Sequence, residues 1–224
     1  MIPWVQVDTA PVPDYGGELR LMRRGTEFSI LVGRTTLMNS RMSGSEIALA
    51  ELACGRLRGR RKSRVLIGGY GMGFTLRAAL AGLGKDAEVT VAELVPAVLD
   101  WARGPMAELT AGSLSDPRVV LRETDVGHLI AKARTRYDAI LLDVDNGPDS
   151  LSRSANNRLY DLSGLHAARL ALAPKGLLAV WSAGPDNAFA RRLEHAGFAV
   201  DEIQVRAHKG RGVRHVIWAA TKPD

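Results

Sequence analysis

The chain has 224 residues, of which 46% are hydrophobic and 24% are charged, a mixture that excludes disordered and fibrous proteins. This length suits one main hydrophobic core with a small appendage. No apolar run approaches the roughly 20 residues of a membrane span, and the first residues lack the basic and apolar regions of a signal peptide. We therefore expect a cytoplasmic protein without a membrane partner.

The formal net charge is +6, with 30 basic against 24 acidic residues. Two basic clusters, residues 55–64 and 206–215, are not interleaved with aromatic residues and fall where turns are expected. We interpret them as solvated turns or as counterweights to an anionic ligand, and we do not expect nucleic acid to bind. Cys54 is the only cysteine and the five histidines show no ligand spacing, so neither a disulfide framework nor a metal site is expected.

The first part of the chain predicts a small β-rich extension. Residues 17–40 alternate apolar and polar side chains on either side of two turn sequences, the pattern of an antiparallel meander. Ser45 then precedes an apolar, helically spaced segment and is expected to be its N-cap. We therefore divide the chain into a β-rich extension over 1–43 and a main domain over 44–224.

The rest of the chain predicts parallel βαβ units, because short apolar runs alternate with amphipathic helical segments. The expected strands are 64–67, 88–92, 119–122, 139–142, 177–181, 199–205 and 213–220. The expected helices are 74–81, 95–109, 126–133, 157–172 and 186–196. The last two strands are too close in sequence for a crossover helix. The predicted fold is therefore a Rossmann-like α/β domain whose mostly parallel seven-stranded sheet ends in an antiparallel hairpin.

Three alternating glycines, Gly69, Gly71 and Gly73, follow the first strand of this domain and precede a helix. Such a loop turns tightly and lets a ligand approach bare backbone. Packing alone also produces glycine-rich turns, so the loop by itself leaves both explanations open.

Acidic residues end the next three strands, at the edge of an open α/β sheet where ligands bind. Glu93 is placed to accept the hydroxyl protons of a ribose. Asp125 is placed either to cap the next helix or to accept the amine of an adenine. Asp143 and Asp145 share one side of the chain if their strand persists, so a cationic amine would suit them. Mutual repulsion would let one of them take a proton from that amine, although Asp145 also fits the start of a turn.

These residues resemble the spermidine synthase family of polyamine aminopropyltransferases and, more broadly, the class I S-adenosylmethionine-dependent methyltransferases, whose fold that family shares. The resemblance extends from the meander at Gly17 to the final strand. It implies that loop 67–73 holds a sulfonium nucleoside, that Glu93 holds its ribose, that Asp125 meets its adenine and that Asp143 deprotonates the attacking amine. The donor site expected on this basis comprises Gly69, Tyr70, Gly71, Met72, Gly73, Glu93, Leu94, Asp125, Val126 and Asp143.

The chain departs from the family's pattern at two places. Met72 stands where the family's glycine loop has an aspartate that meets the ammonium of a decarboxylated donor. A neutral residue would tolerate the carboxylate of intact S-adenosylmethionine, so we expect the intact donor. Of the family's acceptor-binding Tyr-His-Glu segment only Glu46 is retained. The residues expected to bind the acceptor are Glu46, Asp145, Tyr160 and Trp181, and those expected to carry the chemistry are Asp143 and Asp145.

The sequence thus predicts a transferase that uses S-adenosylmethionine to move an alkyl group, most readily methyl, to an amine or another small nucleophile. One alternative is aminopropyl transfer to a polyamine from decarboxylated S-adenosylmethionine. Another is a non-catalytic scaffold that binds a nucleoside. Edge strands in the meander also make a homodimer an expectation.

Overall fold

The computed structural model describes residues 2–13, 17–144, 157–208 and 211–224. The described chain begins with a four-stranded antiparallel sheet in the order β1 (Val5–Pro11), β2 (Glu18–Arg24), β3 (Glu27–Val32) and β4 (Thr35–Asn39). The strands β2 to β4 form the meander that the alternation predicts. The strand β1 is not among the expected strands, because prolines surround it and most of its side chains are exposed, so it has no buried alternation.

A seven-stranded sheet forms the main body, in the order β10-β11-β9-β8-β5-β6-β7. Its strands are β5 (Arg64–Gly68), β6 (Glu88–Glu93), β7 (Val119–Glu123), β8 (Tyr137–Leu142), β9 (Leu172–Ser182), β10 (Ala199–His208) and β11 (Arg211–Thr221). The pairs from β9 through β8, β5 and β6 to β7 are parallel, whereas β11 is antiparallel to both β9 and β10. The predicted fold class, a mostly parallel sheet with a C-terminal antiparallel hairpin, is confirmed.

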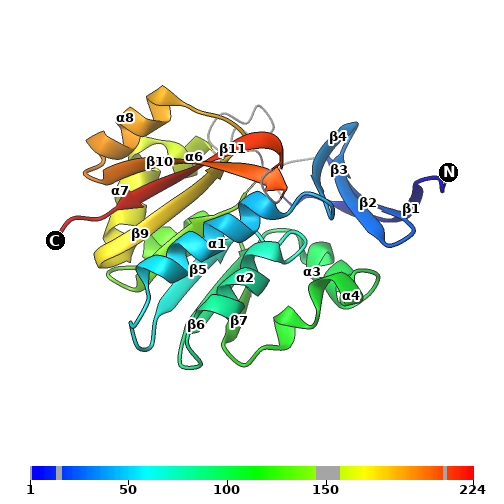
Figure 1. Ribbon diagram of the computed structural model, residues 1–224, viewed down its shortest axis with the longest axis horizontal. Coiled ribbons are helices and arrows are strands. Elements are labelled where there is room, and N and C mark those ends of the chain that lie inside the picture. The colour runs from blue at the N-terminus through cyan, green and yellow to red at the C-terminus, as the bar shows by residue number, and fades with distance from the viewer. Residues whose placement is uncertain (1, 14–16, 145–156, 209–210) are drawn as a thin grey trace.

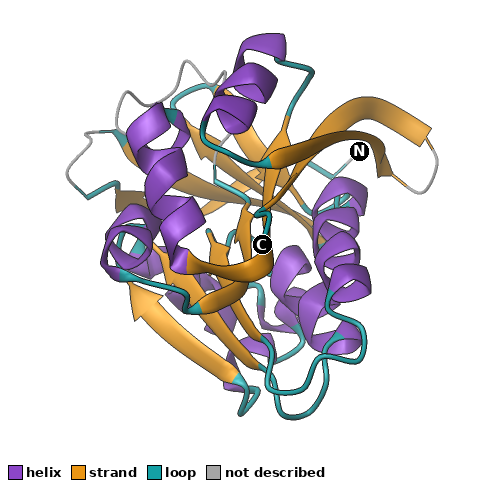
Figure 2. Ribbon diagram, turned by 90° about the vertical axis from the view of Figure 1, so that its left-hand side faces the viewer, coloured by secondary structure: helices purple, strands orange, loops and turns teal. Residues whose placement is uncertain are grey.

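Helices cover both faces of this sheet (Figure 2). They are α1 (Gly44–Arg56), α2 (Phe74–Gly82), α3 (Pro96–Arg103), α4 (Ala107–Thr110), α5 (Val126–Lys132), α6 (Asn157–Tyr160), α7 (Leu162–Ala171) and α8 (Asn187–His195), with a 3-10 turn at Ser113–Ser115. The sheet divides two hydrophobic clusters, because Val65 and Ile67 of β5 point to one face while Leu66 points to the other. The cluster around Val65 also includes residues of α1, α2, α3 and the N-terminal sheet. None of the helices among the described residues is long and apolar enough to cross a lipid bilayer.

Three local expectations differ from the structure. The helix expected over 95–109 is split into α3 and α4 at Gly104, and the one over 157–172 is split at Asp161, whose side chain caps α7. Ser45 is not an N-cap, because α1 already begins at Gly44. The Ser45 hydroxyl instead contacts the carboxylate of Glu46.

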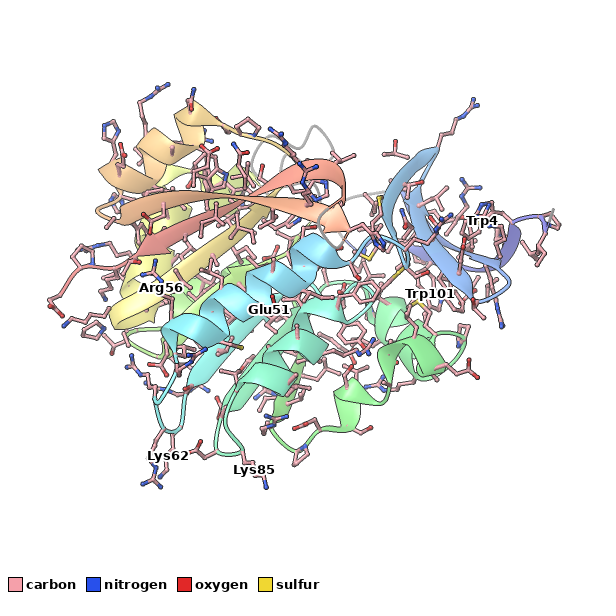
Figure 3. The ribbon with its side chains drawn as sticks, viewed as in Figure 1. Trp4, Glu51, Arg56, Lys62, Lys85 and Trp101 are labelled. Atoms are coloured by element: carbon pink, nitrogen blue, oxygen red, sulfur yellow. The ribbon has the colours of Figure 1, made fainter. Side chains whose placement is uncertain are left out.

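The N-terminal sheet packs beside the carboxyl ends of the parallel strands, to the right of the main sheet in Figure 1. The indole N–H of Trp101 on α3 donates a hydrogen bond to Asp8 of β1 (2.7 Å). Figure 3 labels Trp101 and, near the N-terminus, Trp4. The strand β4 ends at Asn39 and α1 begins at Gly44, and the expected division at residue 43 falls between them. The small sheet therefore stands over the edge where the sequence places the acidic residues.

Candidate active site

A narrow cleft of about 100 Å³ lies between the two sheets. The main domain contributes the glycine loop and the ends of β6 and β8, and the N-terminal sheet contributes an apolar wall of Leu19, Ile30, Leu37 and Met38. A much larger cavity, about 1060 Å³, lies between α1 and α2, but none of the residues predicted for the site lines it. The chemistry predicted from the sequence therefore belongs to the smaller cleft.

The glycine loop is closely packed on two sides. Gly69 has a φ of +84°, and a Cβ atom there would lie 2.6 Å from the backbone oxygen of Asp143. A Cβ atom at Gly71 would lie 2.6 Å from the Cε atom of Met38. Both Gly69 and Gly71 also line the cleft. The two explanations that the sequence left open, packing and ligand access, are therefore compatible at this loop.

Glu93 is buried at the end of β6 and ties two turns together. Its Oε2 atom accepts a hydrogen bond from the backbone N–H of Tyr70 (2.9 Å), and its Oε1 atom accepts one from Val95 (2.9 Å). Burial raises the pKa of this carboxyl, and the backbone donors oppose that rise. The carboxylate thus fixes the glycine loop and lines the cleft at the same time.

Asp125 lies at the end of β7 and is the N-cap of α5. Its Oδ1 atom accepts a hydrogen bond from the backbone N–H of Gly127 (2.6 Å), so the capping role that the sequence allows is confirmed. Asp125 also lines the cleft, together with its predicted neighbours Leu94 and Val126. The second role, contact with a base, stays a prediction.

Asp143 lines the cleft, and the carboxyl group of Glu46 lies close enough for the charge of Asp143 to act on it. Asp143 follows β8, and the Thr75 hydroxyl of α2 donates a hydrogen bond to its Oδ2 atom (2.6 Å). Burial raises the pKa of Asp143 to about 6 despite that hydrogen bond. Burial, followed by the nearby charge of Asp143, raises the pKa of Glu46 to about 7. Both carboxyl groups therefore lose their protons at a higher pH than an exposed carboxyl does.

The other side of Glu46 contacts residues that the sequence did not indicate. The Ser45 hydroxyl lies 2.8 Å from Oε2 of Glu46, and Nδ1 of His215 lies 2.9 Å from the Ser45 hydroxyl. The His215 ring packs edge-to-face on Trp181, with 4.8 Å between ring centroids. Thr75 had a local signal, since it stands in the first turn after the glycine loop. His215 had none, because only the pairing of β11 with β9 brings it to α1.

Several predicted site residues lie away from the cleft. Tyr70 is buried, and its hydroxyl contacts the Ser113 hydroxyl (3.1 Å). The side chain of Met72 is packed in the core cluster and is 1% exposed. Tyr160 packs edge-to-face on Phe189.

The other residues predicted for the site are Gly73, Trp181 and Asp145. Gly73 precedes α2 in a left-handed conformation. Trp181, at the end of β9, joins the group around His215. Asp145 lies outside the described residues. Within the described part of the chain, no group of His, Cys, Asp and Glu side chains could hold a metal ion.

The chain resembles known aminopropyltransferases in sequence, although no family model matches it. It is 37% identical over 151 residues to polyamine aminopropyltransferase 1 of Streptomyces coelicolor, which covers 64% of this chain and 28% of that protein. It is 34% identical over 150 residues to a polyamine aminopropyltransferase of Mycobacterium tuberculosis, with 63% and 28% covered. The match thus spans less than a third of the length of these relatives.

Solved structures share the fold at low sequence identity. The spermidine synthase of Thermotoga maritima superposes with a TM-score of 0.77 at 16% identity, over 97% of this chain and 72% of that one. A spermidine synthase in complex with the transition-state analogue AdoDATO gives 0.76, with the same identity and coverage. A Burkholderia thailandensis N-methyltransferase with bound S-adenosylhomocysteine gives 0.57 at 19% identity, over 80% and 79%. Sequence similarity and fold together confirm the resemblance: the chain is spermidine synthase-like, with a class I methyltransferase-like fold.

Proposed function

We propose that this chain is a transferase that moves the aminopropyl group of decarboxylated S-adenosylmethionine to an amine of a small polyamine such as putrescine. The observation that carries the proposal is the pair of neighbouring carboxyl groups at the cleft, Asp143 in its lining and Glu46 next to Asp143. The sequence similarity to polyamine aminopropyltransferases supports it. Methyl transfer, the reading that the sequence alone favours, has no comparable support.

The charge of the cleft favours the decarboxylated donor. Three carboxyl groups, Glu93, Asp125 and Asp143, line the cleft, and no lysine, arginine or histidine of the described chain does. A donor with a sulfonium and an ammonium group is attracted by such a lining, whereas the carboxylate of intact S-adenosylmethionine would have no cationic side chain to meet. Met72 packs in the core cluster, and the lack of an aspartate at this position of the glycine loop stays a departure from the family's pattern.

In this proposal Glu93 accepts the ribose hydroxyl protons, and Asp125 accepts the amine of the adenine. The acceptor nitrogen attacks the aminopropyl carbon in line with the sulfonium. The new C–N bond forms as the C–S bond breaks, and the electron pair of the broken bond stays on sulfur in methylthioadenosine. Asp143 and Glu46 orient the amine and receive the proton that its nitrogen loses.

Substitution of Asp143 tests the proposal. Asp143→Asn removes the charge but keeps an oxygen that can accept from Thr75, so we expect the protein to fold and kcat/KM to fall by at least ~100-fold. The assay combines intact or decarboxylated S-adenosylmethionine with a polyamine mixture and identifies the products by mass spectrometry. Glu51 is an exposed residue of α1 and is labelled in Figure 3. Glu51→Gln is the matched control, and we expect it to keep full activity.

Three outcomes of this assay would contradict the proposal. Methylated products from the intact donor would restore the methyltransferase interpretation. Failure to bind either donor or methylthioadenosine in calorimetry would favour a scaffold. Full activity of Asp143→Asn would remove the carboxylate pair from the reaction.

The expected homodimer and the cytoplasmic location stay predictions. Val5 and Val7 of the edge strand β1 are exposed at 59% and 41%, an arrangement that favours pairing with a second copy. Light scattering of the purified chain would give the mass of the assembly.

A further inference from the structure

A continuous chain of contacts leads from β11 to the carboxylate pair. Nδ1 of His215 lies 2.9 Å from the Ser45 hydroxyl, which lies 2.8 Å from Oε2 of Glu46. Ser45 is 1% exposed, so no bulk water competes for its hydroxyl. Three elements far apart in sequence, β11, α1 and the end of β8, thus meet at Glu46 and Asp143.

The chemistry of the groups fixes the direction of these hydrogen bonds. An ionised carboxylate only accepts, so the Ser45 hydroxyl donates its proton to Glu46. The oxygen of that hydroxyl then accepts from His215, which must carry a proton on Nδ1. The edge-to-face contact with Trp181 holds the imidazole in the required orientation. If Glu46 takes a proton, both hydrogen bonds can reverse once the imidazole proton of His215 has moved from Nδ1 to Nε2.

We propose that His215 is a positioning residue which, through Ser45, holds the Glu46 carboxylate beside Asp143 as the second proton acceptor of the site. Its role in the reaction rests on the proposed function, whereas the chain of hydrogen bonds does not. Without a donor at Nδ1 the Ser45 hydroxyl is free to turn away from Glu46. The carboxylate would then lose the side-chain hydrogen bond from Ser45, which favours its ionised form.

Among the described residues, few groups other than Ser45 act on the charge of Glu46. Asp143, from the end of β8, is the ionised group that acts on it, and it opposes ionisation. The helix α2 contributes the Thr75 hydroxyl. The strand β10 contributes backbone carbonyls next to Gly44. Burial lowers the pKa of His215, so the imidazole meets Ser45 as a neutral donor.

These hydrogen bonds can be tested in the free protein, without any turnover. Nitrogen-15 NMR of labelled wild-type protein at pH 8 should show the His215 proton on Nδ1, and carbon-13 NMR should give the titration of the Glu46 carboxyl. In His215→Phe we expect the pKa of Glu46 to rise by roughly half a pH unit to one pH unit. In His215→Asn the side-chain amide takes about the place of Nδ1, so we expect the wild-type titration. His208→Phe, an exposed position on the neighbouring strand β10, is the control.

Ser45→Ala is a second variant for the case in which His215→Phe does not fold. It removes the middle group of the same series of hydrogen bonds and should raise the pKa of Glu46 by a similar amount. A His215 proton on Nε2 in the wild type would overturn the inference, as would an unchanged Glu46 titration in both His215→Phe and Ser45→Ala.

The pH profile of kcat/KM then tests whether the hydrogen bonds from His215 to Glu46 affect the reaction. In His215→Phe the acidic limb should move to higher pH by the same amount as the Glu46 titration, and His215→Asn should restore it. A merely structural role would lower kcat at every pH without moving the limb, and that result would overturn the positioning role. If the wild type transfers nothing to any amine, the proposed function fails, and the NMR titrations still decide the inference.

Discussion

Two acidic side chains, Asp143 and Glu46, bring like charges together in a partly desolvated place, and this arrangement costs stability. Each has a folded-state pKa above its ordinary value, so these two groups bind more protons in the folded protein than in the unfolded chain between about pH 4 and pH 7. Their contribution to the free energy of unfolding therefore falls as pH rises. Under the proposed function, the same arrangement that lowers stability supplies the proton acceptors of the reaction.

Glu46→Gln should reverse part of this loss. The substitution removes one charge, so we expect the free energy of unfolding at pH 8 to rise by ~1–3 kcal/mol relative to wild type, with little difference at pH 4.5, where both carboxyls of the wild type are mostly protonated. Urea unfolding of both proteins at the two pH values measures the change, and Glu51→Gln serves as the control. A Glu46→Gln protein that is less stable than wild type at pH 8 would contradict the assigned direction of the pKa shifts.

At the scale of elements, the glycine loop makes two close contacts of different kinds. The approach of Gly69 to Asp143 is to a backbone oxygen at the end of β8, whereas the approach of Gly71 to Met38 is to the flexible end of a side chain on β4. A backbone oxygen held in a sheet cannot yield, but a methionine can change rotamer. The two glycines should therefore differ in tolerance, although both have positive φ.

Gly69→Ala should destabilise the protein more than Gly71→Ala does. Both changes strain a left-handed residue by about 1–2 kcal/mol, and only the first also meets fixed backbone. We expect Met38→Ala to recover part of the loss in Gly71→Ala and none in Gly69→Ala, as measured by thermal unfolding. Equal losses in the two single variants, or equal rescue, would show that the loop moves as a unit instead.

The sequence predicts the elements of the main sheet well and the site only in part. The expected β5 to β8 agree with the structure to within two residues, because buried parallel strands are continuous apolar runs with clear ends. The acids at the ends of β6 and β8 follow from the same pattern, and the structure places both at one cleft. The contact of Ser45 with His215 was missed, because His215 reaches α1 only after β11 enters the sheet. Local pattern carries no information on such a contact.

At the scale of the whole molecule, two sheets with separate hydrogen-bond networks share one cleft. Its volume of about 100 Å³ is smaller than the ~300–1,000 Å³ that ligand pockets usually have. Under the proposed function the nucleoside needs more room than this, and we expect the apolar wall of the N-terminal sheet, with Leu37 and Met38 of β4, to move outward when it binds. The main sheet is packed on both faces and is the more rigid side.

Only four residues, 40–43, join β4 to the helix that begins with Gly44 and carries Glu46. This short segment connects the small sheet directly to α1. If a nucleoside displaced the small sheet, the movement would be transmitted to the carboxylate of Glu46, which lies in the first turn of α1. Insertion of two glycines after Arg41 should make the segment 40–43 longer and more flexible. We expect the Kd for methylthioadenosine to stay within about twofold of the wild-type value, while amine turnover falls. Calorimetry and steady-state kinetics measure the two effects, and equal losses in both would mean that the segment only supports the wall. If amine turnover alone falls, residues 40–43 couple the two halves of the site, so that the donor is bound before the acceptor.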